Sequence, residues 1–335
     1  MANKLEQLLA QYRELGIDNQ IDYDKFYLYS LITHSTAIEG STITELENQI
    51  MFDHGISLKG KSIEEQCMNL DLKVAYEKAI GLAKQHHPLS TETLVSLSAL
   101  VMKNTGKEYK TALGDFSSAR GELRLLNVTA GVGGRSYMNY SKVPSRLAEF
   151  CKQMNENREK ASDMTTDELY QLTFDAHYQL VTIHPWADGN GRMARLVMNM
   201  LQFEFGLIPT KILQEDKEEY IKALVATRED DDLNIFRMFM SSMMEKNLQN
   251  EINSFLESIG EEESREKTLK GREKTPKSRE KIVALLSEDG KLSAVALAER
   301  IGISAKSVEK HLANLKADGI IERIGPAKGG YWKVK

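Results

Sequence analysis

The residue types of a phosphate site are concentrated in the run IHPWADGNGRMAR at positions 183–195. Residues 189–191 (Gly-Asn-Gly) lead into a segment with helical periodicity that ends near Gly206. The first amides of a helix have no internal partners and lie at the positive end of its dipole, so they bind anions. Arg192 and Arg195 are three residues apart and share a helix face. Two guanidinium groups beside glycine-flanked amides suit a polyphosphate.

Two further residues of the run could do chemistry on a bound phosphate. Asp188 is a hard oxygen ligand beside the glycines and would suit a Mg²⁺ ion shared with phosphates. His184 is near enough in sequence to act as an acid or base on a group that approaches those phosphates. Taken alone, a Gly-Asn-Gly sequence is more often a turn or a helix cap, two arginines on one helix are more often a solvated or ion-paired face, and a His-Pro pair more often has no role. Their concentration in one short run favours nucleotide chemistry.

The elements around this run are predicted to be mainly helical. Apolar residues recur at three- and four-residue steps through most of the first 260 residues, and the whole chain has only 6 prolines. Residues 111–143 lack that periodicity and are rich in glycine, which predicts a loop followed by a short hairpin with its turn near Gly131 to Gly134. A long loop inside a helical body is more often functional than idle.

The C-terminal part of the chain has a different pattern. Residues 261–279 are strongly charged and predict a linker or an exposed helix end. Beyond them, the pattern predicts three short helices at 282–286, 294–301 and 305–317, then two strands at 320–324 and 331–334. Three helices and a hairpin are typical of a winged helix-turn-helix. The predicted domains are therefore a helical region at 1–110, a core at 111–260, the linker at 261–279 and a winged helix at 280–335.

Composition indicates a soluble cytoplasmic protein without a disulfide scaffold. The chain has 335 residues, 41% hydrophobic and 28% charged, with two cysteines and no apolar run long enough to cross a bilayer. The N-terminus lacks the pattern of a signal peptide. The net charge is −5, yet residues 276–335 carry 12 basic and 7 acidic side chains, so the body is acidic and the tail domain basic. This asymmetry hints at two kinds of partner.

The run from His184 to Arg192, with Arg195 beyond it, resembles the signature of the Fic (filamentation induced by cAMP) family. The resemblance extends over about residues 35–243. One departure is mild, because Trp186 stands where the family usually has phenylalanine. The resemblance implies a Fic-type helical core with a small β-hairpin flap, and a protein adenylyltransferase that moves AMP from ATP to a serine, threonine or tyrosine hydroxyl.

The resemblance also implies a role for each residue of the motif. His184 would be the general base, and Asp188 would hold Mg²⁺, with Mn²⁺ as an alternative. The remaining residues of the motif would bind the phosphates: Gly189, Asn190, Gly191, Arg192 and Arg195. The flap, within residues 121–139, would pair with an extended segment of the target protein by strand addition. A purely structural hairpin is the alternative.

An upstream segment resembles the inhibitory motif of the same family. Ser35 and Glu39 lie one helical turn apart in STAIEG, and Gly40 would end the helix. By this resemblance Glu39 would pair with Arg195 and place negative charge where the γ-phosphate of ATP should lie. In some relatives the same glutamate supports removal of AMP, so both directions of the reaction stay open. An ordinary surface carboxylate is the alternative for Glu39.

Three expectations rest on weaker signals. Tyr220 would line the adenine pocket or pack in the core. The winged helix would meet DNA, through Lys306, Ser307, Lys310 and Lys328, or a protein partner, and a homo-oligomer is left open. The competing function is a transcription regulator whose Fic-like core only senses a nucleotide. The intact His184 favours an enzyme, because a sensor needs the phosphate site but no base.

Overall fold

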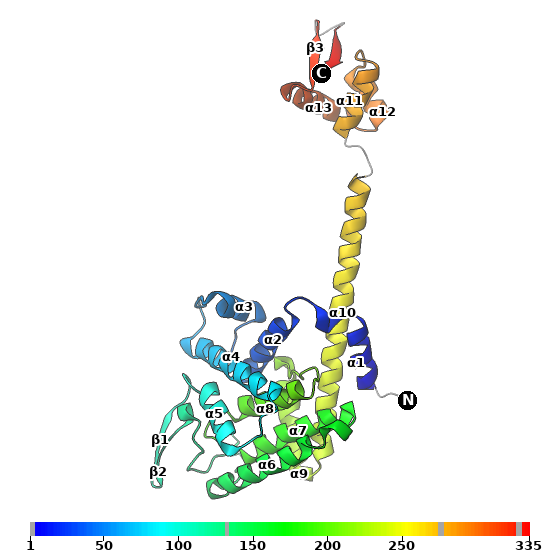
Figure 1. Ribbon diagram of the computed structural model, residues 1–335. Coiled ribbons are helices and arrows are strands. Elements are labelled where there is room, and N and C mark those ends of the chain that lie inside the picture. Colours follow the sequence, from blue (N-terminus) through cyan, green and yellow to red (C-terminus); the bar gives the residue numbers. More distant parts are fainter. Residues whose placement is uncertain (1–3, 131–133, 274–277, 326–329) are drawn as a thin grey trace. The chain divides into compact units, whose positions relative to one another are not determined.

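The computed structural model describes residues 4–130, 134–273, 278–325 and 330–335, and the chain forms two compact units, residues 1–255 and 256–335. The first unit is built from helices (Figure 1). They are α1 (Lys4–Glu14), α2 (Tyr23–Ile38), α3 (Glu45–His54), α4 (Ile63–Lys84), α5 (Thr91–Val101), α6 (Val143–Arg158), α7 (Thr166–Ile183), α8 (Asn190–Glu204), α9 (Lys217–Asp230) and α10 (Leu233–Glu273), which continues beyond residue 255.

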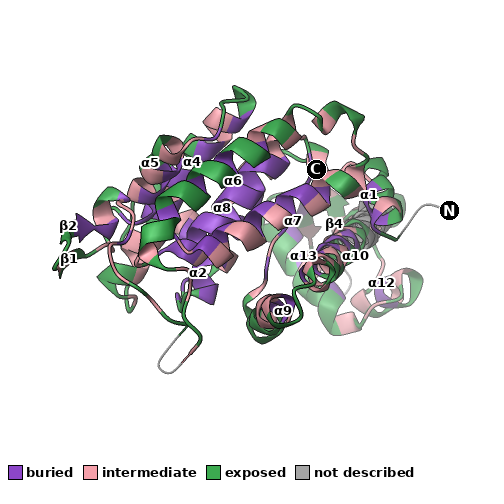
Figure 2. Cartoon of the chain, turned by 90° about the horizontal axis from the view of Figure 1, so that it is seen from below, coloured by how far each residue is buried: buried purple, intermediate pink, exposed green. Residues whose placement is uncertain are grey.

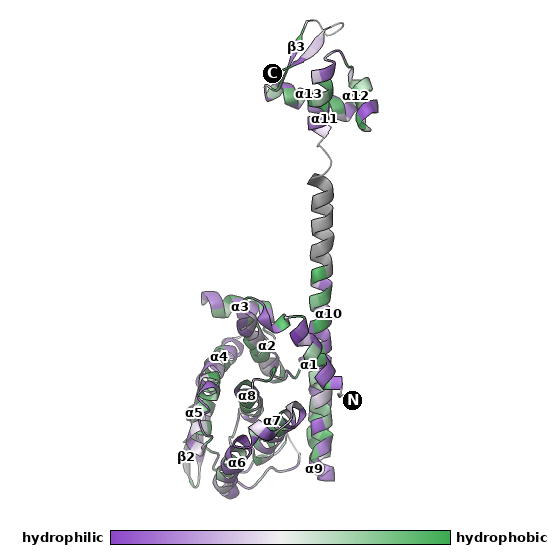
Figure 3. Ribbon diagram, turned by 45° about the vertical axis from the view of Figure 1, so that its right-hand side comes forward, coloured by the Kyte–Doolittle hydropathy of each residue, from purple (hydrophilic) through white to green (hydrophobic). Residues whose placement is uncertain are grey.

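Helix α8 lies at the centre of the first unit. It packs against α4 and α7, and more lightly against α2 and α5 (Figures 1 and 3). Nearly all of its residues are buried, as the purple ribbon in Figure 2 shows. Its apolar residues belong to one large core, but the helix also carries five buried polar side chains: Asn190, Arg192, Arg195, Asn199 and Gln202. Two arginines in the core need partners, because burial penalises an unpaired charge.

Several helices of this unit begin directly after a side chain that caps their first amides. Thr44, Ser62 and Thr165 each begin a helix with a capping box, in which a glutamate three residues later bonds back to the cap. Helix α8 differs, because its N-cap is Gly189 at φ 82° and no side chain caps its amides. The amides of its first turn are therefore left for another acceptor.

The non-helical segment between α5 and α6 contains two antiparallel pairings. Strands β1 (Glu108–Thr111) and β2 (Gly114–Ser117) form a hairpin. Farther along, Thr129 and Ser136 form an isolated antiparallel bridge. The predicted flap corresponds to this second pairing, and Gly131, at the start of its predicted turn, lies with residues 132–133 outside the described part of the chain.

The β1–β2 hairpin corrects the sequence analysis, which read the segment from residue 111 as loop. Its connection is Ala112-Leu113, which lacks the Asn-Gly or Asp-Gly pair that marks a tight hairpin. The pair is instead stabilised by stacking of Tyr109 on the buried Phe116, with ring centroids 4.8 Å apart. Such a cross-strand contact has no local sequence signature.

The second unit has the predicted three helices and hairpin. Helices α11 (Ser278–Glu288), α12 (Ala294–Ile301) and α13 (Ala305–Ala317) precede strands β3 (Ile321–Ile324) and β4 (Tyr331–Val334). The strands pair antiparallel, with Ile321 opposite Val334. A separate core holds this unit together: Ile282, Leu286, Leu297, Val308, Leu312, Leu315 and Ile321. The mainly helical fold class is thus confirmed. Lys328, a predicted phosphate contact, lies outside the described residues.

The predicted linker is largely helical in its backbone, because α10 continues to Glu273. Within the described residues, no helix combines the length and the apolar character that crossing a bilayer requires.

Candidate active site

The backbone of His184 holds an unusual conformation at the end of α7. His184 is the C-cap residue, with φ 51° and ψ 62° in the left-handed region, and its amide donates to the carbonyl of Leu180 at 2.9 Å. Few non-glycine residues adopt this conformation, and those that do cluster at functional sites where surrounding contacts enforce it. Here Arg124 supplies such a contact, because its Nε donates to the carbonyl oxygen of His184 at 2.7 Å.

The ring of His184 is a neutral imidazole with one free lone pair. Nδ1 lies 3.3 Å from the carbonyl oxygen of Val181 and must donate to it, so the proton is on Nδ1 and the lone pair on Nε2. Burial lowers the pKa of His184 to about 4. At neutral pH the ring is therefore uncharged, and its Nε2 can accept a proton. One ring face stacks on Tyr137, with centroids 3.7 Å apart.

Arg192 is a buried guanidinium with unused donors. It is 4% exposed, and its Nη2 lies 3.1 Å from Sδ of Met102 and 3.7 Å from Oδ1 of Asp188. Its Nε and Nη1 are buried without a hydrogen-bond partner. An unsatisfied buried donor costs about 1–3 kcal/mol, and more when it is charged. The site is therefore incomplete as it stands and suited to an anion.

Arg195, one turn farther along α8, is held by the end of α2. Its Nε donates to Oγ of Ser35 at 2.8 Å, and its Nη2 donates to the Ser35 carbonyl at 2.9 Å and to Oε1 of Glu39 at 2.5 Å. Its Nη1 is buried without a partner. Arg195 therefore has one donor left over even while Glu39 is in place.

Glu39 puts a negative charge against the first turn of α8. A Cβ atom at Gly191 would lie 2.8 Å from Oε1 of Glu39, so the carboxylate almost touches the helix backbone there. Burial opposes ionisation of Glu39, but the charges of Arg195 and Arg192 outweigh burial and hold the pKa of its carboxyl below the usual value. The carboxylate is thus charged at neutral pH and lies between Arg195 and the first turn of α8.

The glycines and Asp188 shape the entrance to α8. A Cβ atom at Gly189 would lie 2.6 Å from Sδ of Met102, and its φ of 82° also disfavours a side chain. Asn190 locks the preceding loop, since its side chain exchanges hydrogen bonds with the backbone of Trp186 at 3.0 and 2.9 Å. Asp188 accepts from the Gly189 amide at 2.6 Å, yet its side chain is 52% exposed.

A metal at this site would depend on a single protein carboxylate. No group of three or more His, Cys, Asp or Glu side chains that could hold a metal occurs among the described residues. Mg²⁺ is commonly held by one or two carboxylates together with substrate phosphates and water. The half-exposed Asp188 beside the unpaired donors of Arg192 fits that arrangement.

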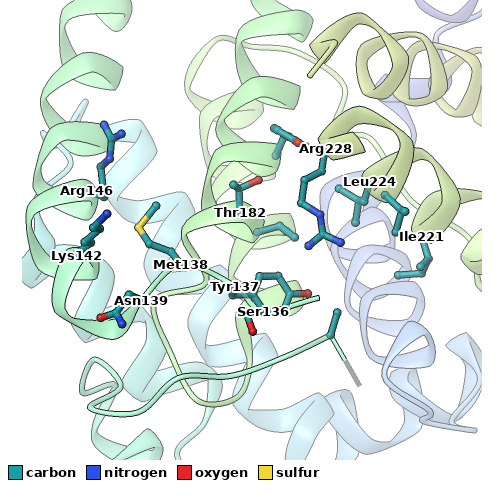
Figure 4. Close-up of a pocket in the computed structure, with 14 residues that line it drawn as sticks. Ser136, Tyr137, Met138, Asn139, Lys142, Arg146, Thr182, Ile221, Leu224 and Arg228 are labelled. Atoms are coloured by element: carbon teal, nitrogen blue, oxygen red, sulfur yellow. The ribbon is translucent and has the colours of Figure 1, made fainter. Parts of the chain in front are cut away.

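A cavity of about 630 Å³ borders Tyr137, whose ring stacks on that of His184 (Figure 4). Tyr137 lines it, and Arg228 lies over the Tyr137 ring at 6.0 Å. The end nearest α9 is mainly apolar, with Ile221, Leu224 and Val225 from α9 and Val181 from α7. The other end is bordered by Lys142, which precedes α6, and by Arg146 of α6. The volume is within the range of ligand pockets, about 300–1,000 Å³.

Tyr220 does not line this cavity. It is 2% exposed, its hydroxyl lies 3.0 Å from Nε2 of His177, and its ring packs against Phe236 and Phe239. This placement agrees with the core-packing alternative. The next residue, Ile221, faces the cavity instead, because consecutive helix residues point about 100° apart.

The structure brings together the motif residues and the end of α2, and it adds three residues that sequence reasoning missed. Arg124 bonds to the His184 carbonyl, Met102 accepts from Arg192, and Tyr137 stacks on His184. Each comes from a segment far from the motif in sequence. Only Tyr137 had a local signal, as an aromatic residue in the predicted flap.

Comparisons with known proteins agree with this geometry. Residues 88–202 match the Fic/DOC family, and residues 276–322 match a family described as winged helix-turn-helix DNA-binding. The chain is 27% identical over 239 residues to protein adenylyltransferase fic-1 of Caenorhabditis briggsae, covering 71% of this chain and 43% of that protein. It is 28% identical over 222 residues to protein adenylyltransferase Fic of Drosophila grimshawi, covering 65% and 41%. The chain thus spans less than half the length of these curated relatives.

Solved structures share the fold. A Fic-domain-containing signalling protein from Bacteroides thetaiotaomicron superposes with a TM-score of 0.63 at 21% identity, covering 76% of this chain and 97% of that one. A Fic family protein from Desulfovibrio desulfuricans superposes with a TM-score of 0.55 at 17% identity, covering 100% and 97%.

Proposed function

We propose that this chain, which carries a Fic domain and a C-terminal winged helix-turn-helix domain, is a protein adenylyltransferase that transfers AMP from ATP to a hydroxyl of a target protein. The observation that carries the proposal is the pair of buried arginines on α8 with unpaired donors, beside a neutral histidine. The curated relatives are named protein adenylyltransferases, which supports the same reaction.

The reaction we propose is an in-line displacement at the α-phosphorus of ATP. The target oxygen forms a bond to phosphorus, the bond from the α-phosphorus to the bridging oxygen breaks, and pyrophosphate leaves. Nε2 of His184 takes the hydroxyl proton. The chemistry requires positioning and charge neutralisation more than covalent help from the protein.

The residues at the start of α8 would hold the phosphates. The amides of residues 190 and 191 would face the phosphate oxygens, since that of Gly189 already donates to Asp188, and the free Nε and Nη1 of Arg192 would pair with the β-phosphate region. Arg195 would pair with the γ-phosphate once Glu39 no longer occupies it. Asp188 would hold Mg²⁺, which neutralises phosphate charge when bound.

The nucleoside would occupy the cavity beside His184. Its apolar end offers Val181, Ile221 and Leu224, and Tyr137 offers an aromatic face. A base sandwiched between aliphatic side chains and an aromatic ring excludes water from both of its faces. Ile221 therefore replaces Tyr220 as the α9 residue that we assign to the adenine.

The target would bind along the flap. Residues 128–130 and 135–137 pair with each other through Ala130 N to Arg135 O at 3.1 Å and Tyr137 N to Val128 O at 3.0 Å. A target segment added to this ladder gains main-chain hydrogen bonds with little demand on its sequence. Tyr137 belongs to the same ladder and stacks on His184, so the hydroxyl would arrive beside the base.

Glu39 would restrain the enzyme. Its carboxylate takes one donor of Arg195 and lies against Gly191, so it places like charge where the terminal phosphate of ATP should bind. ATP can then bind only with its phosphates displaced from the in-line pose. Removing the Glu39 carboxylate should increase AMP transfer while leaving His184 and the amides at the start of α8 in place.

Labelling with ATP tests the transfer and its base together. The Glu39→Gly variant is incubated with Mg²⁺ and ATP carrying ³²P at either the α or the γ position. AMP transfer predicts protein label from the α position only, and loss of that label in Glu39→Gly/His184→Ala. Label from the γ position would show a kinase instead. Intact ATP binding with no label on the protein or in a cell extract would favour the nucleotide sensor.

A further inference from the structure

Arg124 is a buried arginine whose partners are all backbone carbonyls. It is 1% exposed and lies between β2 and the flap. Its Nε donates to the carbonyl of His184 and its Nη1 to that of Leu126, both at 2.7 Å, and its Nη2 donates to that of Met138 at 2.5 Å. Its own amide donates to the carbonyl of Pro185 at 3.1 Å.

The charge of Arg124 is not neutralised by an ion pair. No carboxylate within the described residues forms a salt bridge with it, in contrast to Arg195 and Arg158. Burial lowers the pKa of Arg124, which reflects the cost of holding the charge there. An apolar side chain would fill the same space without that cost. The arginine therefore contributes something other than packing.

What Arg124 contributes is a rigid connection between three backbone segments. Leu126 precedes the first limb of the flap, Met138 follows the second limb, and His184 carries the base. The planar guanidinium presents its donors at fixed angles, so the three carbonyl oxygens are held at fixed positions relative to one another. One of these carbonyls belongs to the residue with φ 51°, whose conformation requires support.

We infer that Arg124 is a positioning residue that locks the base of the flap to the backbone of His184, so that a hydroxyl presented by the flap meets Nε2. The inference rests on the proposed transfer reaction for its effect on rate, but the connection itself is a property of the fold. Lysine cannot replace the arginine, because an ammonium is a single donor centre and cannot reach three carbonyls in a fixed fork.

The test compares Arg124→Lys and Arg124→Met with the parent Glu39→Gly. Arg120→Lys is the matched control, because Arg120 lies four residues upstream, its side chain is exposed, and its ion pairs among the described residues are with Glu108 and Glu122. Both Arg124 variants should transfer AMP about 100-fold more slowly than the parent, the loss that a misplacement of about 1 Å can cause. The control should match the parent.

Two further measurements separate positioning from loss of structure. ATP affinity, measured in a His184→Ala background, should fall much less than the transfer rate, because the two arginines that would hold the phosphates, Arg192 and Arg195, form no hydrogen bond with Arg124 within the described residues. Hydrogen exchange at the amides of Ala130 and Tyr137 should be faster, because the flap has lost its attachment. Arg124→Lys keeps the charge and most of the volume, so it serves if Arg124→Met does not fold.

The inference is overturned if Arg124→Lys transfers AMP at the parent rate, or if ATP affinity falls in proportion to the rate, which would indicate a general structural role. Failure of the proposed function would look different. The parent itself would not transfer, while the exchange of the two flap amides would still report whether Arg124 holds the flap.

Discussion

Replacing Glu39 should strengthen the binding of ATP much more than that of ADP. Oε1 of Glu39 lies 2.5 Å from Nη2 of Arg195, and the site proposed for the γ-phosphate includes that arginine. ADP has no γ-phosphate, so the effect of the glutamate on ADP should be small. The difference between the two nucleotides isolates the contact in question.

The size of the effect follows from the charges. Two unit charges about 4 Å apart interact by about 4 kcal/mol at an effective dielectric constant of ~20. The side chain of Glu39 is 34% exposed, so water screens part of this interaction, and about 2 kcal/mol is a reasonable net value. At about 1.4 kcal/mol for each tenfold change, Glu39→Gly should tighten ATP binding by about 30-fold.

The assay is calorimetric titration with Mg²⁺ in a His184→Ala background, where ATP is not consumed. Glu39→Gln serves as the second variant, because it removes the charge and keeps the shape and the helix end. Both variants should favour ATP over ADP more strongly than the protein with Glu39. Equal gains for ATP and ADP, or no gain for either, would refute the assignment of Arg195 to the γ-phosphate.

Three other outcomes are expected. The AMP-transfer rate of Glu39→Gly should be nearly constant from pH 6 to 8. It should fall only as the pH approaches the lowered pKa of His184, about 4, because protonation removes the base. A pH–rate profile in which the rate halves near pH 6.5 would contradict this. Met102→Leu should weaken pyrophosphate binding several-fold in a calorimetric titration, because Nη2 of Arg192 loses its acceptor. Unchanged affinity for pyrophosphate would show that the thioether of Met102 does not orient Arg192. If the winged helix binds DNA, its affinity for DNA should fall steeply as the salt concentration rises. Lys310→Ala should then weaken binding by about the same factor on any DNA sequence, as expected for a phosphate contact. Failure of the protein to bind DNA at low salt would favour a protein partner.

The sequence predicted the parts of the site that are contiguous in the chain. The turn before α8, its two arginines and its glycines follow local rules of helix starts and glycine conformation, so their arrangement could be read directly. The helices of the second unit were predicted for the same reason, since their caps and apolar spacing are local. Helices α12 and α13 begin and end at the predicted residues.

The parts that depend on tertiary contacts could not be predicted. Arg124 is 60 residues from His184 in the chain, and nothing near it indicates that its partners would be carbonyls. The left-handed conformation of His184 has no sequence marker, because histidine rarely adopts it. Tyr220 and Ile221 were indistinguishable as pocket residues until the rotation of α9 about its axis was known.

In the proposed mechanism, restraint and catalysis share one helix. The N-terminus of α8 supplies the amides and arginines for phosphate, and the end of α2 presents Glu39 to the same donors. Because the carboxylate and a phosphate would need the same guanidinium, they would exclude each other. Inhibition would therefore need no change at His184, whose backbone is held by α7 and Arg124.

The most direct test of the account is the α-phosphate label on three proteins: the wild type, Glu39→Gly, and Glu39→Gly/His184→Ala, each with Mg²⁺ and a cell extract as a source of targets. The account predicts weak labelling of protein by the wild type, strong labelling by the single variant and none by the double variant. Labelling by the double variant as strong as that by the single one would contradict the role of His184. Equal labelling by the wild type and the single variant would contradict the restraint by Glu39.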